Sequence, residues 1–231
     1  MKDQLILLLE TATSSCSVAL SENGKIIAVK EANEPNIHAS HITLFIEELM
    51  VKTGKRYSDL SAVAVSKGPG SYTGLRIGVS TAKGLCYALD IPLLGIDTLE
   101  AMVSGLLSQN YIQDSDLLIP MIDARRMEVY TGIFQKDLKV LEPVSAKIVD
   151  ITSFEQFKGK NLILFGDGAG KFRELFSGQS NISFLEFTNS AKDLNKLAYR
   201  KLSNTETENV AYFEPFYLKD FLVTKSTKNN F

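Results

Sequence analysis

The chain has 231 residues, of which 45% are hydrophobic, enough to bury a core in one large domain or two small ones. Charged residues make up 23% and the formal net charge is −2, which argues against tight RNA binding by this chain alone. Two cysteines, Cys16 and Cys86, and a short apolar run before Glu10 predict a cytoplasmic protein without signal peptide or membrane span.

The first half of the sequence predicts a three-stranded meander followed by alternating helices and strands. Residues 4–9 form a continuous apolar run, which is typical of a strand buried on both faces. The strand-like runs 15–20 and 25–30 flank Asn23-Gly24, which predicts a β-hairpin. The other elements expected in this half are a helix at 38–53, a strand at 61–66, a helix at 72–89, a strand at 92–96 and a helix from Asp97.

The second half repeats this order of elements without sequence identity. It predicts strands at 117–122, 126–134, 138–144 and 161–165, and a helix at 190–203. We therefore predict an α/β protein of two halves, 1–106 and 107–231, each with an antiparallel meander joined to parallel strands. The polar tail at 225–231 is expected to be frayed, or to return to the first half.

Acidic residues stand at the end of the first predicted strand of each half. Glu10 and Asp123 hold these positions, where related two-half folds bind a nucleotide through glycine-containing hairpins. The turns that follow here, 11–14 and 124–126, contain no glycine, which such a close approach to phosphate requires. We expect both acids to cap turns or to pair with a neighbouring cation.

Other short motifs do not fit known ligand sites. The segment 166–171 lacks the first glycine and the final Ser or Thr of a P-loop, and the glycines at 68–74 miss the dinucleotide-binding spacing. His38 and His41 lie three residues apart near a helix start. Two imidazoles alone make a poor zinc site, so both are expected at the surface or in an interface.

The segment 68–89, GPGSYTGLRIGVSTAKGLCYAL, resembles the TsaB family of bacterial threonylcarbamoyladenosine biosynthesis proteins. Its glycine loop consists of Gly68, Pro69, Gly70, Ser71 and Gly74. Further stretches that resemble the family in the same order are 6–20, 59–60, 99–101, 123–125, 128–130, 166–168 and 215–218. The resemblance covers nearly the whole chain and implies an actin/Hsp70/sugar-kinase-like (ASKHA) fold of two RNase-H-like halves.

The resemblance also implies a role in tRNA modification. TsaB-like proteins pair with a catalytic paralogue, TsaD, and support transfer of a threonylcarbamoyl group to adenosine 37 of tRNA; a TsaE-like ATPase joins the complex. It implies no cofactor bound by this chain alone, ATP and metal in the partner subunits, tRNA contact only through the complex, and homodimers when the chain is alone. Where the paralogue has two metal-binding histidines, this chain has Thr98 and Met102, which cannot replace them.

The predicted helices 38–53 and 72–89 each carry a second stripe of apolar or small residues, beside the face that packs on the sheet. On helix 72–89 the stripe is small and weakly polar, and mid-helix Gly84 costs about 1 kcal/mol relative to alanine. We predict that these stripes contact another chain in a helical bundle, although the protein's own second half is an alternative cover. The predicted interface residues are Ile37, His41, Leu44, Val51, Ile77, Thr81, Gly84 and Ala88.

Two further functions remain open from the sequence. One is an autonomous metallopeptidase-like or sugar-kinase-like enzyme, which would bind a metal or nucleotide by itself. The other is an RNase-H-like nuclease that uses Glu10, Asp97 and Asp123, although the lack of a basic surface argues against it.

Overall fold

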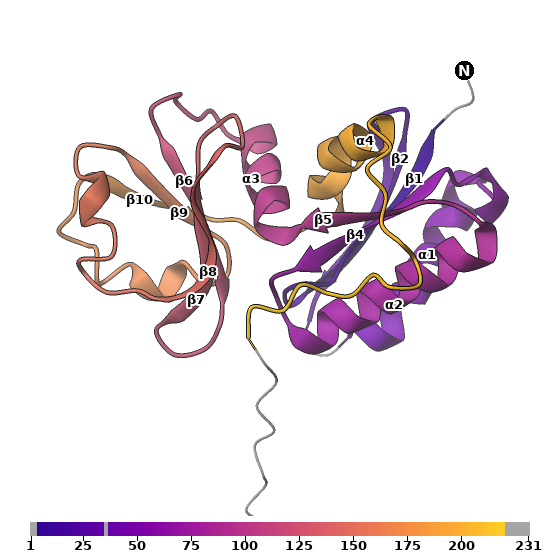
Figure 1. The fold of residues 1–231 in the computed structure, drawn as a ribbon, viewed down its shortest axis with the longest axis horizontal. Helices are drawn as coiled ribbons and strands as arrows, with labels where there is room; N and C mark the ends of the chain where they lie inside the picture. The colour runs from indigo at the N-terminus through magenta and orange to yellow at the C-terminus, as the bar shows by residue number, and fades with distance from the viewer. Residues whose placement is uncertain (1–3, 35–36, 220–231) are drawn as a thin grey trace, which may run out of the picture.

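The computed structural model describes residues 4–34 and 37–219, which form two five-stranded mixed sheets (Figure 1). The strands of the first sheet, in spatial order, are β3 (Lys25–Asn33), β2 (Ser15–Glu22), β1 (Leu5–Glu10), β4 (Ala62–Gly68) and β5 (Leu93–Asp97). Those of the second are β10 (Ile182–Leu185), β9 (Leu162–Phe165), β6 (Leu117–Asp123), β7 (Glu128–Phe134) and β8 (Val140–Ile148). The predicted α/β fold with two similarly ordered halves is confirmed.

Strand β1 occupies the centre of the first sheet, and all six of its residues are buried as predicted. It pairs antiparallel with β2 and parallel with β4, and β6 does the same with β7 and β9 in the second sheet. The hairpin between β2 and β3 turns at Asn23 and Gly24, whose φ angles of 51° and 79° are those of a left-handed turn. The repeated order inferred from the sequence is therefore a repeated topology.

Helices cover both faces of the first sheet (Figure 1). The helices α1 (His38–Thr53) and α2 (Tyr72–Leu89), which have the predicted bounds, pack on one face. The 3₁₀ helix η4 (Ala191–Leu194) and the helices α3 (Thr98–Gln109) and α4 (Asn195–Ser203) pack on the other. Within residues 4–34 and 37–219, none of the helices combines the length and apolar character that crossing a membrane requires.

The predicted helix at 190–203 forms as η4 and α4, but it does not pack on the second sheet. Leu194, Leu197 and Ala198 are buried in the core on the face of the first sheet that α3 also covers. The apolar side chains of this segment therefore complete the first half, although the chain reaches it after leaving the second. The division of the chain at residue 106 stays a prediction.

Helix α3 connects the halves, because it is buried on two sides. Ala101 faces the core of the first sheet, whereas Leu99 and Val103 pack with strands of the second. The other face of the second sheet is covered by turns and by the short 3₁₀ helices η2 (Glu155–Phe157) and η3 (Gly170–Phe172), which close a core rich in phenylalanine. Strand β10 was not predicted, because four residues are too few to show a clear alternation.

Residues 204–219 return along the first half. The Glu208 amide donates to the Leu93 carbonyl at 2.9 Å, and the Phe216 amide donates to the Lys67 carbonyl at 2.7 Å. The Lys83 ammonium of α2 donates to the carbonyls of Ala211 and Phe213 at 3.2 and 2.9 Å. The segment thus lies across β5 and α2. The predicted frayed tail at 225–231 falls outside the described residues.

Candidate functional site

The glycine loop packs against the turn between β1 and β2. The Ser71 amide donates to the Ala12 carbonyl at 2.7 Å, and the Ser71 hydroxyl caps α2 by accepting from the Gly74 amide at 3.3 Å. A Cβ atom on Gly70 would overlap Ala12, and one on Gly74 would overlap the Thr11 carbonyl. The glycines therefore serve close packing of backbone on backbone, and the loop does not form the phosphate cradle that its composition suggests.

A cleft of about 710 Å³ opens between the two halves. One wall is the glycine loop with the turn after β1, and the other is the turn after β6 with Asp167. Residues 216–219 of the returning segment lie at its edge. The cleft thus lies between the two strand-end turns, where related two-half folds bind a nucleotide.

Both strand-end acids cap their turns, as predicted. The Glu10 carboxylate accepts from the Ala12 amide at 2.6 Å and from the Ser66 hydroxyl at 3.0 Å, and the side chain is 1% exposed. Asp123 accepts from the Arg125 amide at 3.1 Å and pairs with the Lys171 ammonium at 2.5 Å. Burial raises the pKa of the Glu10 carboxyl to about 7, because a buried charge loses its hydration.

The three acids of the nuclease hypothesis do not form a metal site. Asp97 is the N-terminal residue before α3, and burial raises the pKa of its carboxyl. In the part of the chain that the structure describes, no group of three or more His, Cys, Asp or Glu side chains is arranged to hold a metal ion. Glu10, Asp97 and Asp123 are therefore not gathered as that hypothesis requires.

Thr98 and Met102 are both used in internal packing. The Thr98 hydroxyl, fully buried, accepts from the Gly68 amide at 3.2 Å and so ties α3 to the glycine loop. Met102 is buried in the core between α3 and the second sheet, and a Cβ atom on Gly166 would overlap its methyl group. Thr98 thus fixes the start of α3 within the first half, and Met102 packs the same helix on the second sheet.

The histidines differ from the prediction in one respect. His38 is buried, and its Nε2 lies 3.3 Å from the Ser15 carbonyl, so its placement at the surface or in an interface is wrong. Its position at the first turn of α1 points the ring toward β2. His41 is half-buried and packs edge to face on Phe45, with ring centroids 5.5 Å apart.

The far sides of α1 and α2 expose apolar and small residues. Leu44 is 51% exposed and Val51 is 77% exposed, and a Cβ atom on Gly84 would have open space around it. The protein's second half therefore does not cover these positions, and that alternative is wrong for them. We call the following set the outer helix face: Leu44, Val51, Thr81, Gly84 and Ala88. The predicted interface residue Ile77 is left out, because it is half-buried, packs against the core of the first sheet and lines the cleft.

Ile37 does not belong to the outer helix face. It is 8% exposed and lies in the core between the first sheet and the helices α1 and α2. The heptad spacing placed it in line with Leu44 and Val51, but Ile37 precedes the first turn of α1, where the backbone is still entering the helix. Tyr87, which the stripe pattern missed, is 84% exposed beside Ala88.

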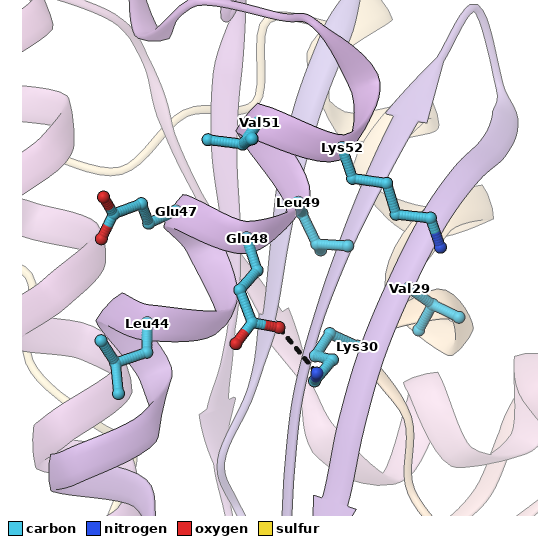
Figure 2. Close-up of a pocket in the computed structure, with 8 residues that line it drawn as sticks. All are labelled: Val29, Lys30, Leu44, Glu47, Glu48, Leu49, Val51 and Lys52. Atoms are coloured by element: carbon cyan, nitrogen blue, oxygen red, sulfur yellow. Dashed lines mark ion pairs between the residues drawn. The ribbon is translucent and has the colours of Figure 1, made fainter.

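Leu44 and Val51 also line a groove of about 530 Å³ between α1 and β3 (Figure 2). Its rim carries the ion pair between the Lys30 ammonium and the Glu48 carboxylate, at 2.6 Å. The remaining lining residues are Val29, Glu47, Leu49 and Lys52. The groove extends the apolar surface of α1 toward the edge strand β3, which the sequence pattern of α1 alone did not indicate.

Glu10 gives the folded protein a pH-dependent stability. Since the folded state keeps this proton up to a pH of about 7, the unfolded carboxyl ionises first and stability falls as pH rises from about 4.5 to 7. We expect Glu10→Gln, which retains an acceptor oxygen for Ala12 and Ser66, to match the wild type at pH 4 and to be more stable by about 3 kcal/mol at pH 8. Denaturant unfolding at both values measures this, with exposed Glu155→Gln as control. Equal stabilities at pH 8 would mean that Glu10 is not held protonated.

The fold and the cleft define a two-half actin-like protein whose glycine loop and metal-ligand positions are filled by its own packing. Residues 35–225 match the family described as TsaD: tRNA N6-adenosine threonylcarbamoyltransferase. The chain is 29% identical over 229 residues to the tRNA threonylcarbamoyladenosine biosynthesis protein TsaB of Escherichia coli, which covers 95% of this chain and 96% of that protein. The chain is also 30% identical over 175 residues to the TsaB protein of Buchnera aphidicola subsp. Schizaphis graminum, which covers 73% of this chain and 81% of that protein. The chain therefore belongs to the TsaB family and matches the TsaD family model.

Two other similarities agree with this assignment. The chain is 40% identical over 111 residues to the tRNA N6-adenosine threonylcarbamoyltransferase of Bacillus subtilis, which covers 41% of this chain and 32% of that enzyme. A crystal structure from Pseudomonas aeruginosa, described as an uncharacterized protein with similarity to peptidase YEAZ, superposes with a TM-score of 0.79 at 25% identity. The superposition covers 94% of this chain and 100% of that one, so the whole fold is shared.

Proposed function

We propose that this chain is a non-catalytic partner subunit in the synthesis of N6-threonylcarbamoyladenosine at position 37 of tRNA. It binds and supports a TsaD-like catalytic paralogue, and a TsaE-like ATPase joins the complex. The similarity to both TsaB and threonylcarbamoyltransferase sequences supports this pathway. Under this proposal the chain itself binds no cofactor, and ATP and metal belong to the partner subunits.

The outer helix face is the observation that carries the proposal. Leu44, Val51 and Tyr87 expose apolar surface on two neighbouring helices, and Gly84 leaves room for a helix backbone to approach. Burial of this surface against a second pair of helices stabilises a complex without rearranging the core beneath. A free chain has the same surface available for pairing with another copy of itself.

The packing of the cleft supports a role without catalysis. Thr98 is held by the glycine loop and Met102 by the core between α3 and the second sheet, so a metal ligand at either position would disturb the packing of α3. The glycine loop itself lies against the backbone of residues 11 and 12. These contacts favour a partner subunit over an autonomous sugar-kinase-like or metallopeptidase-like enzyme.

Removal of this chain from its cell is expected to abolish N6-threonylcarbamoyladenosine in tRNA. Mass spectrometry of hydrolysed tRNA measures the loss, and re-expression of the chain serves as the control. Affinity purification of the full chain is expected to recover the TsaD-like paralogue in equimolar amount. Normal levels of the modified nucleoside after removal would contradict the proposed function.

A further inference from the structure

The arginines of this chain divide into two groups of three. Arg56 pairs with Asp59, Arg173 with Glu186 and Arg200 with Glu100. The other three form no ion pair with any residue in the described ranges. Arg125 lines the cleft, Arg126 follows it in the same turn, and Arg76 contacts Tyr72 and Tyr217, which line the cleft. We call this region the cleft mouth: Arg76, Arg125, Arg126, Tyr72 and Tyr217.

On the first half, Arg76 is positioned by two tyrosines that line the cleft. Its guanidinium lies 4.3 Å from the centroid of the Tyr72 ring, and its Nε donates to the Tyr217 hydroxyl at 3.3 Å. The two tyrosine rings lie 4.9 Å apart, and Glu214 acts on Arg76 only at longer range. The exposed guanidinium therefore keeps its terminal N–H groups available for an acceptor.

On the second half, Arg125 and Arg126 form the tip of the turn between β6 and β7. Both are exposed, and their φ angles of 72° and 52° are left-handed. The two acids of this turn are already neutralised, because Asp123 pairs with Lys171 and Glu128 pairs with Lys219. Asp167 also lies on this wall and accepts from the Asp123 amide at 3.0 Å, so the four cations Arg125, Arg126, Lys171 and Lys219 stand against three acids, in a chain whose net charge is −2.

Guanidinium groups without an ion pair, one of them beside two tyrosine rings, suit a phosphate backbone with adjoining bases. A free mononucleotide would instead need backbone N–H groups aimed at its phosphates, and the Ser71 and Gly74 amides donate within the chain. Arg125 lines one wall of the cleft and Arg76 contacts the tyrosines that line the other, an arrangement that fits a strand crossing the opening better than a small ligand inside it.

We propose that the cleft mouth contacts the phosphate backbone of the RNA substrate when the chain is in its complex. This inference rests on the proposed function, which supplies the RNA. Three arginines are too few to hold RNA alone, in agreement with the acidic composition, but they orient an RNA that the complex also binds elsewhere.

The test uses the assembled complex of this chain with its TsaD-like partner and unmodified tRNA. Arg125→Asn with Arg126→Asn removes both charges, and asparagine tolerates the left-handed backbone. We expect roughly tenfold weaker tRNA binding, and a slope of log affinity against log salt reduced by about 1.5, since two phosphate contacts are lost. Fluorescence anisotropy at several salt concentrations measures both. Arg56→Asn with Arg173→Asn removes equal charge elsewhere and is expected to change neither.

Each other outcome overturns the proposal in a recognisable way. Equal effects of the two double variants would show that only net charge matters. Failure of Arg125→Asn with Arg126→Asn to assemble would identify a protein contact, and competition by ATP at micromolar concentration would identify a mononucleotide site. If the wild-type chain forms no complex, the proposed function fails. The RNA contact is proposed only within the complex, so in that case it fails together with the proposed function.

Discussion

Leu44→Asp combined with Ala88→Asp is expected to weaken binding of the TsaD-like paralogue by at least about 100-fold. Each change places a carboxylate at the centre of the outer helix face, where complex formation would strip it of water without a partner charge. Leu44 is half exposed and Ala88 is exposed, so the free chain loses little packing. This variant is therefore expected to fold like the wild type and to lose binding of the paralogue.

Isothermal titration of the two purified subunits measures the loss, and thermal unfolding of the free chain checks the fold. Tyr111→Asp with Val140→Asp is the matched control, because both residues are exposed on the second half. We expect the control to bind like the wild type. An outer-face variant that still bound with wild-type affinity would show that the paralogue docks elsewhere, and the residue assignment would have to be abandoned.

Gly74→Ala is expected to lower the free energy of unfolding by about 3 kcal/mol. The added Cβ atom would overlap the Thr11 carbonyl, which belongs to the backbone after β1 and cannot turn away as a side chain does. Relief of the overlap requires the glycine loop and the β1–β2 turn to separate. The effect should therefore appear as lost stability of the whole first half.

Gly84→Ala in the same helix is the matched control, because nothing lies within 4 Å of the added atom. We expect it to stabilise the free chain by about 1 kcal/mol through helix propensity. Urea unfolding of both variants gives the comparison. If Gly74→Ala were as stable as Gly84→Ala, the close contact with Thr11 would not be what requires glycine at position 74. Weaker partner binding by Gly84→Ala would further support close helix approach there.

Local pattern predicted the helices and the central strands well. The bounds of α1 and α2 follow from apolar spacing and from end signals, since Gly54 ends α1 in a left-handed conformation and Ser71 caps α2. The same local patterns could not predict which of the two sheets η4 and α4 cover. Their apolar residues suit either sheet, and only the path of the chain returns them to the first.

The sequence predicted those features of the candidate site that depend on a single helix, but not those that depend on how distant segments pack together. The exposure of Leu44 and Val51 follows from their position on α1, whereas the burial of Ile37 and His38 depends on how the chain enters that helix. The arrangement of the unpaired arginines around the cleft could not be predicted from the sequence. Arg76 and Arg125 are far apart in sequence and belong to different halves.

Helix α2 has two charged side chains, Arg76 and Lys83, and both hold the returning segment. The hydrogen bonds of Lys83 to two carbonyls keep its ammonium to one side of the stripe that contains Gly84 and Ala88. A partner that covers this stripe therefore removes no ion of α2 from water. On the α2 side, the association therefore avoids the dehydration penalty that charged helix surfaces carry, and its strength there depends on shape and apolar area.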